Sequence, residues 1–530
     1  MVAVLMASAF LAEGAQLTLL GLKGQGQVRS EPVQPVTRNV ARPDIVDRTG
    51  RLLATDVAMP SLFVDPSRVV DRDEVAEKLA EALPGIDQRG LLADIQDKTR
   101  HFVWVKRGLT PSEAKTVHDL GLPAVSFRDE LRRVYPAGED GGHVLGYVDA
   151  ENRGATGIER YIDTQGLAET TDGSARSERP PVVLSLDFAV QHALKTELDR
   201  ALTDFGAAAA AGLVLDTRTG EVLADVSLPD FPAGNAALSL EPDHLDRVTG
   251  GAFELGSVFK TVTLAMAQDA GILTAGKLFD ATQPLQIGDY SIDDFHATRR
   301  KLTAEEVFLH SSNIGAALMA QEAGEAQQRA FLDKVGLTEP LTTELGRMAQ
   351  PQLPARWSKT TALTVAFGHG IALAPMQFAA AVAGLVRQAG PVPPTFLKAD
   401  QSTPPVATAV VSSSTSAFLR LLLRHNVTNP EGTGKRALVA GYDVGGKTGT
   451  ADIAGKGGYG GHGVLSSFLA VWPIAEPRYL SYILLWAPQP TEADKGQTAA
   501  GLTAAPVSGR LIARISPQLG LAPIYGDGGT

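Results

Sequence analysis

A polar segment at residues 164–181 divides the chain into two parts that must each form a hydrophobic core of their own. The segment contains no large apolar residue except Leu167 and ends in Pro180-Pro181. Domain boundaries typically fall in polar, proline-rich stretches where few contacts cross. The chain, at 530 residues, is long enough to bury more than one core. We therefore predict one domain at 43–163, a linker at 164–181 and a larger domain at 182–525.

The larger domain begins and ends with strand patterns and has helical patterns between them. Residues 213–216 and 221–226 flank Thr217-Arg218-Thr219-Gly220, which is a hairpin signal. Strands at both ends with helices between them indicate an antiparallel sheet with helices packed on it, an α+β fold. The other expected elements are strands at 467–472 and 479–486, helices at 256–269, 305–322 and 504–516, and loops in the Pro-rich 391–405 and Gly-rich 455–463 stretches.

The smaller domain reads as mixed α/β. Residues 44–53 look like two short strands around a turn at Thr49-Gly50. Apolar residues recur at helical spacing over 75–83. A second helix is expected to begin at Thr110, because a threonine cap, a proline and a glutamate follow one another as in a capping box.

The first 22 residues contain a single charged side chain, Glu13, and are just long enough to cross a bilayer. Glu13 lies in the middle of the segment, and Lys23 follows it on the side that the positive-inside rule disfavours for an N-in anchor. We interpret residues 1–22 as a transmembrane anchor and 23–42 as a spacer. A secretory signal and a buried core helix are the alternatives.

Composition excludes several kinds of chemistry. The chain has no Cys, which excludes disulfides, thiol nucleophiles, Fe–S clusters and cysteine-ligated zinc. The closest histidines, His296 and His310, have no metal-ligand spacing, and we predict no metal. The net charge of −11 argues against nucleic acid as a partner.

Three short motifs carry candidate chemistry: Ser257-Val258-Phe259-Lys260, Ser311-Ser312-Asn313 and Lys447-Thr448-Gly449-Thr450. About one S-x-x-K is expected by chance in a chain of this length. A second one is indeed present, at Ser112–Lys115, where the capped helix start explains it as a surface feature. Order and spacing of the three motifs are therefore more informative than any one of them.

Ser257 has a context that favours catalysis over a plain buried helix start. Helical spacing places Ser257 and Lys260 one turn apart on one face, and the residues around them are apolar. Free backbone N–H groups at a helix N-terminus can stabilise an oxyanion. A lysine among apolar side chains with a second cation nearby can lose its proton at neutral pH, which would activate the serine.

The third motif has two interpretations. Residues 441–448 match the phosphate-binding pattern G-x-x-x-x-G-K-[ST], but that pattern requires a helix beginning at the lysine, and Gly449 with a Gly-rich stretch beyond it makes a helix implausible. In a strand, Lys447 supplies a cation, Thr448 and Thr450 supply hydroxyl groups, and Gly449 lets a substrate backbone approach closely. We prefer the strand, along which an extended peptide could pair with its carboxylate held by these groups.

The three motifs, in this order and with 54 and 136 residues between their starts, resemble the penicillin-recognising serine enzymes. Residues 42–54, 133–136, 143–148 and 154–159 resemble the pedestal domain of the class B penicillin-binding proteins, and the similarity extends over roughly residues 40–525. The short pedestal and single N-terminal segment are most like the division-specific, FtsI-type transpeptidase. Because that family carries a basic tail before its membrane segment, the resemblance also implies that this sequence starts late.

The resemblance implies a role for each motif residue. Ser257 would attack the penultimate D-Ala carbonyl of a stem peptide, and Lys260 would take its proton. Ser311 would relay a proton to the leaving D-Ala, and Asn313 would hold Lys260 and the substrate amide. The substrate carboxylate would be bound by the third motif, and the oxyanion by the N–H groups of Ser257 and Thr450. An amine from a second stem peptide would then resolve the acyl-enzyme without metal or organic cofactor. The carboxylate-binding residues would be Lys447, Thr448 and Thr450, with Gly449 keeping the strand open.

The resemblance also implies a setting and leaves alternatives. It implies a single-pass protein of the inner membrane with a periplasmic catalytic domain, acylated by β-lactams. The implied partners are a lipid-II-polymerising glycosyltransferase and other division proteins, bound through pedestal and anchor. An elongation-specific transpeptidase, a D-Ala-D-Ala carboxypeptidase and a non-catalytic penicillin-binding sensor or scaffold remain open. A β-lactamase is disfavoured because no E-x-x-L-N signature lies between Asn313 and Lys447.

Overall fold

The computed structural model describes residues 39–171, 176–288, 290–390, 392–399, 408–455, 458–490 and 497–524. They form two compact units, a smaller one of 39–41, 58–132 and 170–171, and a larger one of 42–57, 133–169 and the described chain from 176 onward. The larger unit thus includes parts of the chain that the sequence analysis places in the first domain. The predicted anchor at 1–22 and nearly all of the spacer at 23–42 lie outside the described residues. Within the described ranges, no helix combines the length and the apolar character needed to cross a bilayer.

The smaller unit packs helices against a strand around one apolar core. Leu79 and Val117, from two of its helices, are buried in this core together with Leu62. The helix predicted at Thr110 begins there, and its capping box is formed: Thr110 accepts from the N–H of Glu113, whose carboxylate accepts from the N–H of Thr110. The elements of the unit include α2 (Arg72–Ala82), α3 (Gln88–Asp94), β4 (Val103–Lys106) and α4 (Pro111–Asp119).

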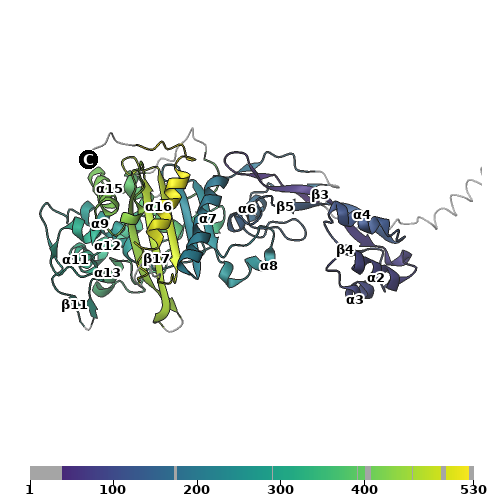
Figure 1. Cartoon of the computed structure of the whole chain (residues 1–530), viewed down its shortest axis with the longest axis horizontal. Helices are drawn as coiled ribbons and strands as arrows, with labels where there is room; N and C mark the ends of the chain where they lie inside the picture. Colours follow the sequence, from purple (N-terminus) through teal and green to yellow (C-terminus); the bar gives the residue numbers. More distant parts are fainter. Residues whose placement is uncertain are drawn as a thin grey trace, which may run out of the picture. The chain divides into compact units, whose positions relative to one another are not determined.

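The larger unit is built on a five-stranded antiparallel sheet, as predicted (Figure 1). The strand order is β16-β17-β18-β8-β9, so the two ends of the larger domain meet in the middle of the sheet. The expected hairpin around Thr217–Gly220 joins β8 to β9. The strands are β8 (Ala209–Asp216), β9 (Val222–Leu228), β16 (Gly445–Gly455), β17 (Gly458–Trp472) and β18 (Tyr479–Trp486).

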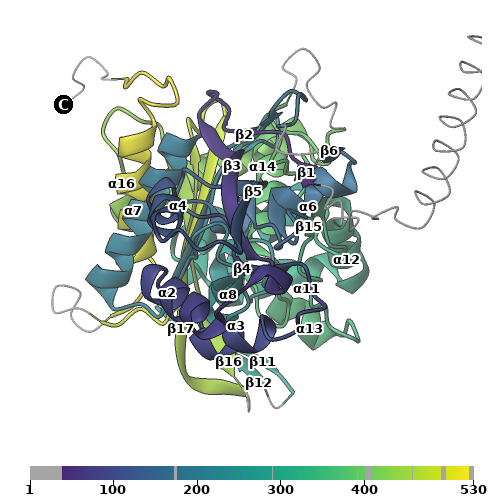
Figure 2. The same ribbon diagram turned by 90° about the vertical axis from the view of Figure 1, so that its right-hand side faces the viewer.

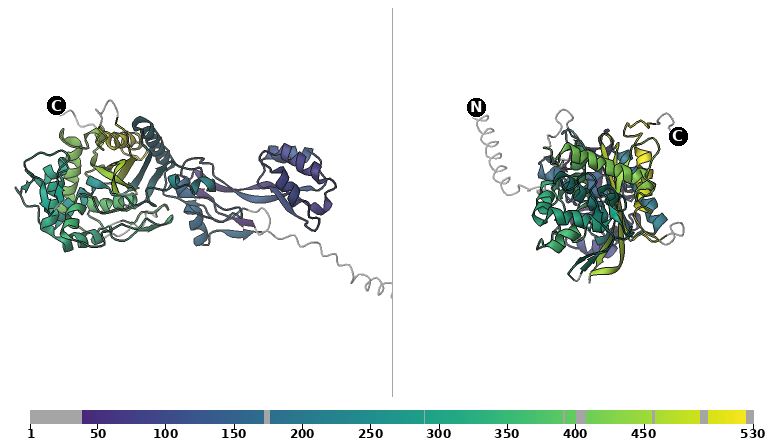
Figure 3. Two further views of the ribbon diagram at one scale, coloured as in Figure 1. Left: turned by 90° about the horizontal axis from the view of Figure 1, so that it is seen from below. Right: turned by 90° about the vertical axis from the view of Figure 1, so that its left-hand side faces the viewer.

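Each face of this sheet is covered by helices. In β18 the side chains of Tyr482 and Leu484 enter one core, and those of Ile483 and Leu485 enter the other, as the two-residue period of a strand requires. α7 (Phe188–Phe205) and α16 (Ala504–Ile515) lie side by side on one face (Figures 1 and 2). The helices drawn in teal and green cover the other face (Figure 3). They include α9 (Lys260–Asp269), α14 (Pro375–Arg387) and α15 (Ser413–Thr428).

Two sequence predictions about the larger unit are wrong. The helix expected at 305–322 is two helices, α10 (Ala304–Leu309) and α11 (Asn313–Ala323), because Ser311 between them has a φ of 59°, which no α-helix accommodates. The Gly-rich stretch expected to be a loop belongs largely to strands, since β16 continues to Gly455 and β17 begins at Gly458. Here cross-strand pairing overrides the low strand propensity of glycine.

A buried ionic network joins segments of the larger unit that are far apart in sequence. The carboxylate of Glu159, on α6 (Gly157–Thr164), accepts hydrogen bonds from the Nε atoms of Arg42 and Arg133, both at 2.7 Å. Asp56 accepts from Arg133 at 3.3 Å and from the backbone N–H of Arg42 at 2.7 Å. All four side chains are buried. The network therefore fixes residues 42–57 and 133–169 to one another.

The remaining elements include two long strands, β3 and β5, and a number of shorter segments. They are β1 (Asn39–Ala41), β2 (Ile45–Val46), β3 (Leu52–Val64), β5 (Val125–Val134), α5 (Gly142–Leu145), β6 (Glu169–Thr171), β7 (Val182–Val183), α8 (Ala236–Ser239), β10 (Phe279–Asp280), β11 (Leu285–Ile287), β12 (Tyr290–Ile292), β13 (Lys301–Leu302), α12 (Glu325–Lys334), β14 (Thr342–Thr343), β15 (Gly346–Arg347) and α13 (Lys359–Val365), with 3₁₀ turns η1 (Pro66–Arg68), η2 (Pro242–His244), η3 (Gly256–Phe259) and η4 (Lys435–Ala437).

Candidate active site

Ser257 lies on the 3₁₀ turn η3, which leads directly into α9. Gly256 before it has a φ of 61°, a conformation that favours glycine. A Cβ at Gly256 would lie 2.4 Å from the carbonyl oxygen of Thr450, so the absence of a side chain also lets η3 approach β16. The serine predicted as nucleophile therefore lies at a helix start and against the strand that carries the third motif.

Lys260 connects the first motif to the second. Its Nζ lies 2.7 Å from Ser257 Oγ and 2.7 Å from Asn313 Oδ1, and it donates to the carbonyl oxygen of Ser311 at 2.9 Å. The lysine side chain is completely buried. Burial, assisted by the nearby cation of Lys447, holds the pKa of Lys260 well below its usual range.

The second motif is the turn between α10 and α11. Ser311 occupies the left-handed backbone region, which directs both its carbonyl oxygen and its hydroxyl group to the two lysines. Ser312 caps α11 by accepting from the N–H of Gly315, and Asn313 is the first residue of that helix. The sequence analysis expected a continuous helix here, and the break is what forms the site.

Lys447 is the third residue of β16, where it pairs with Leu469 of β17, and its Nζ lies 3.0 Å from Ser311 Oγ. The strand interpretation of the third motif is confirmed, and the phosphate-loop interpretation is excluded because no helix begins at this lysine. Burial lowers the pKa of Lys447 to about 7. The Nζ atom of Lys447 lies 5.5 Å from the centroid of the Phe308 ring.

The other residues of the third motif differ in their surroundings. Thr448 is buried and donates its hydroxyl to Thr433 Oγ1 at 2.8 Å, whereas Thr450 is exposed. A Cβ at Gly449 would lie 2.6 Å from the carbonyl oxygen of Leu255 and 2.9 Å from a methyl of Val258. The glycine is therefore needed for contact between β16 and the turn that carries the serine, a reason other than the substrate approach expected from the sequence.

Thr433 is a residue that the sequence analysis missed. It links Thr448 to Asn426 on α15, because Asn426 Oδ1 accepts from both the N–H and the hydroxyl of Thr433. Asn426 also donates to the carbonyl oxygen of Gly446 on β16. Thr433 lies outside the three motifs, before the start of the third motif in the chain, and no local pattern marks it.

The second S-x-x-K lies on the surface, as expected. Ser112 and Lys115 belong to α4 of the smaller unit, where Lys115 pairs with Asp119 at 2.7 Å and both side chains are exposed.

In the part of the chain that the structure describes, no group of three or more acidic or histidine side chains has a metal-binding arrangement.

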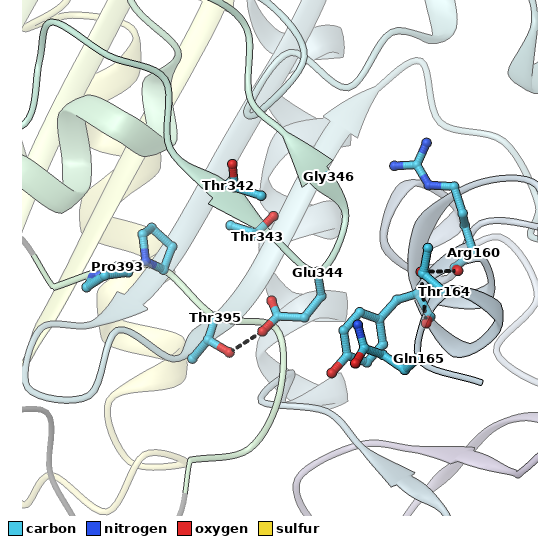
Figure 4. A pocket seen from close by; sticks show the side chains of 11 residues that line it. Arg160, Thr164, Gln165, Thr342, Thr343, Glu344, Gly346, Pro393 and Thr395 are labelled. Atoms are coloured by element: carbon cyan, nitrogen blue, oxygen red, sulfur yellow. Dashed lines mark hydrogen bonds between the residues drawn. The ribbon is translucent and has the colours of Figure 1, made fainter. Parts of the chain in front are cut away.

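A pocket of about 630 Å³ in the larger unit lies between α6 and the β14–β15 hairpin (Figure 4). Glu344 in its wall accepts a hydrogen bond from the hydroxyl of Thr395 at 2.7 Å. None of the residues that line it belongs to the three motifs. The pocket is thus separate in its residues from the site around Ser257.

The site is that of a serine enzyme with lysine as base. A serine hydroxyl 2.7 Å from a lysine amine whose pKa is lowered can pass its proton to that amine as it attacks a carbonyl carbon. A second buried cation, Lys447, lies beside it and suits an anionic substrate group. Fold and site together define a serine acyl-transferring enzyme.

The chain belongs to the class B penicillin-binding proteins. The family profile described as the penicillin binding protein transpeptidase domain matches residues 210–510, and that of the penicillin-binding protein dimerisation domain matches 37–169. The chain is 38% identical over 488 residues to the probable peptidoglycan D,D-transpeptidase FtsI of Caulobacter vibrioides, covering 91% of this chain and 82% of that protein. It is 27% identical to the peptidoglycan D,D-transpeptidase FtsI of Escherichia coli, covering 94% and 87%.

A solved structure supports the fold. The crystal structure of a peptidoglycan synthetase from Bifidobacterium adolescentis superposes with a TM-score of 0.70 at 21% sequence identity, covering 93% of this chain and 97% of that one. These comparisons confirm the family resemblance drawn from the motifs.

Proposed function

We propose that this protein is a peptidoglycan D,D-transpeptidase of the FtsI type, which cross-links stem peptides at the division septum through a serine acyl-enzyme. The observation that carries the proposal is that hydrogen bonds connect all three motifs: Lys260 Nζ contacts Ser257, Ser311 and Asn313, and the hydroxyl of Ser311 contacts Lys447 Nζ. Relatives covering most of the chain are named peptidoglycan D,D-transpeptidases, which supports the choice of substrate.

In the first half-reaction, Ser257 Oγ attacks the penultimate D-Ala carbonyl and its proton moves to the neutral amine of Lys260. The new C–O bond gives a tetrahedral oxyanion next to the backbone N–H groups of Ser257 and Thr450. Collapse breaks the peptide C–N bond, and the leaving D-Ala amine takes a proton by way of Ser311. Ser311 suits this relay because its hydroxyl lies 3.3 Å from Lys260 Nζ and 3.0 Å from Lys447 Nζ.

The terminal carboxylate of the donor peptide would be bound by Lys447 and by the hydroxyl groups of Thr448 and Thr450. In the second half-reaction, the amine of another stem peptide attacks the acyl carbon, the bond to Ser257 Oγ breaks, and the serine regains its proton. Asn313 would have two roles. Its Oδ1 atom holds Lys260 Nζ at 2.7 Å, and its carboxamide would also bind the substrate amide. Gly449 contributes by keeping β16 against η3.

The proposal extends to the setting of the protein. Residues 1–22 would anchor it in the inner membrane with the catalytic unit in the periplasm, because this segment is apolar over nearly a membrane-spanning length. A lipid-II-polymerising glycosyltransferase and other division proteins would be its partners. Mid-cell localisation of a fluorescent fusion is the expected result, and a lateral-wall pattern would instead assign the protein to elongation.

Labelling with a fluorescent penicillin tests the nucleophile. The wild-type chain should form a covalent adduct that maps to Ser257, and Ser257→Ala should abolish it. Ser112→Ala removes the serine of the other S-x-x-K and serves as the matched control, which should label like wild type. Labelling that survives Ser257→Ala would refute the mechanism.

A second assay separates cross-linking from carboxypeptidase action. The protein is supplied with lipid-linked glycan strands and a partner polymerase, and the products are digested to muropeptides. Dimeric stem peptides that depend on Ser257 are expected. Release of D-Ala without dimers would make the protein a carboxypeptidase, and penicillin labelling with neither product would make it a sensor.

A further inference from the structure

Asp294, in the loop after β12, contacts both neighbours of Asn313. One oxygen of its carboxylate accepts the hydroxyl proton of Ser312 at 2.7 Å, and the other accepts the backbone N–H of Ile314 at 3.0 Å. The two oxygens of one carboxylate thus hold the start of α11 on either side of Asn313. Charge-assisted hydrogen bonds of this kind are stronger than neutral ones.

The residue before Asp294 completes this clamp. The carbonyl oxygen of Asp293 accepts from Asn313 Nδ2 at 3.2 Å. Because the NH₂ group of the carboxamide is directed to this carbonyl, its Oδ1 faces Lys260 Nζ at 2.7 Å. The loop therefore determines which end of the Asn313 amide the lysine meets.

The clamp adjoins a strained residue. Ser311 has a φ of 59°, which is uncommon for a residue other than glycine, and such conformations persist only where the surroundings hold them. Ser311 must keep this conformation to direct its carbonyl and hydroxyl oxygens to Lys260. Asp294 holds the next residue in the chain, Ser312, and so restrains the turn from one side.

Asp294 also supplies a negative charge near Lys260. The charged and titratable groups that act on Lys260 are Lys447 from β16, which lowers its pKa together with burial, and Asp294, which raises it. The charge of Asp294 also acts on Arg299 in the same loop. The guanidinium group of Arg299 is nevertheless paired with the carboxylate of Asp293, at 2.9–3.0 Å. Asp294 therefore acts against burial and against the charge of Lys447, the two effects that lower the pKa of Lys260.

We propose that Asp294 is a positioning residue for acylation: its carboxylate holds the Ser311–Asn313 turn in its catalytic conformation and places a negative charge near the Lys260 amine. The inference rests on the proposed function, because it assumes that Lys260 takes the proton of Ser257. It extends that function to a residue outside the three motifs.

The test is the second-order rate constant for acylation by a fluorescent penicillin, measured from about pH 5 to about pH 9 for four proteins. They are the wild-type chain and the variants Asp294→Asn, Ser312→Ala and Asp280→Asn. Asp280 is the matched control, because its exposed carboxylate also accepts one N–H and one hydroxyl, both from Thr282, at 3.1 and 2.6 Å.

Asp294→Asn should lower the plateau rate at least tenfold and move the acid limb of the profile to lower pH, because Lys260 without this carboxylate loses its proton more readily. Ser312→Ala breaks one contact of the clamp but keeps the charge, so it should lower the plateau without moving the acid limb. Asp280→Asn should match wild type in both. Melting temperatures identify any variant that fails to fold.

An Asp294→Asn profile identical to that of Asp280→Asn would overturn the inference. So would a lower plateau with an unmoved acid limb, since Asp294 would then act only as a helix cap. If Asp294→Asn does not fold, an acid limb that moves in Ser312→Ala overturns it. These outcomes leave the proposed function intact, whereas a wild-type chain that is not acylated at Ser257 would refute the proposed function itself.

Discussion

Lys447→Met should make the protein more stable at neutral pH and nearly inactive. Burial lowers the pKa of Lys447 from 10.5 to about 7, so the folded chain binds fewer protons than the unfolded chain between these two values. Stability therefore rises with pH across this window, and the wild-type chain pays the full electrostatic penalty only below about pH 7.

The magnitude follows from the two pKa values. Relative to a neutral side chain, Lys447 destabilises the folded state by about 4 kcal/mol at pH 7 and by about 2 kcal/mol at pH 9. Methionine also loses the hydrogen bonds to Ser311 Oγ at 3.0 Å and to the carbonyl oxygen of Thr448 at 3.2 Å. That loss does not depend on pH, so the change between the two pH values isolates the electrostatic part.

The assay is urea unfolding followed by tryptophan fluorescence at about pH 7 and about pH 9, with Trp472 as a fully buried reporter in the same sheet. The stability gained by Lys447→Met should fall by about 2 kcal/mol between the two pH values. Lys260 acts in the same direction, since its pKa rises when the neighbouring cation is removed. Lys359→Met, on the exposed start of α13, is the control and should show no such change.

A stability difference that is equal at the two pH values would refute this reasoning, because it would mean that Lys447 stays charged in the folded protein. Activity gives an independent check. Removal of the Nζ contact to Ser311 should lower the rate of penicillin acylation at least 100-fold, about 3 kcal/mol of activation free energy.

Three further changes test other parts of the fold. Glu159→Gln leaves two buried guanidinium groups without their shared carboxylate and should lower the free energy of unfolding by about 3–5 kcal/mol, measured by chemical denaturation; a loss below about 1 kcal/mol would contradict this. Gly449→Ala places a methyl 2.6 Å from the Leu255 carbonyl oxygen and should slow acylation at least tenfold; wild-type rates would show that β16 can shift freely. Gln388→Gly removes a residue with φ of 61° at the end of α14 and should raise the melting temperature, whereas a decrease would indicate an unrecognised contact of the glutamine.

The sequence predicted the sheet of the larger unit well because its strands carry local signals. The hairpin at Thr217–Gly220 has turn residues, and β18 (Tyr479–Trp486) is apolar except for Ser481 and is buried on both faces, as a central strand of a sheet covered by helices must be. The family resemblance that the three motifs carry predicted which side chains meet at Lys260. The structure brings Ser257, Ser311, Asn313 and Lys447 together around it.

The break between α10 and α11 could not be predicted in this way. Residues 305–322 have helical periodicity throughout, and Ser311 is not a residue that signals a left-handed conformation. The conformation is held by contacts from distant parts of the chain, from Lys260 to the carbonyl of Ser311 and from Asp294 to Ser312. Periodicity reports which face of a helix is apolar, and it contains no information on such contacts.

The same reasoning explains why the site lies where it does. Two buried lysines and a serine with positive φ each destabilise the fold, so they require surroundings rigid enough to hold them. Lys260 begins α9 at the centre of the larger unit, and Lys447 lies on β16, which pairs along its length with β17. A lysine on an exposed loop would stay protonated in water, and it could not accept the proton of Ser257. Burial in the core thus both weakens the fold and makes the lysine a base, so Lys447→Met and Lys260→Met should each stabilise the protein as they inactivate it.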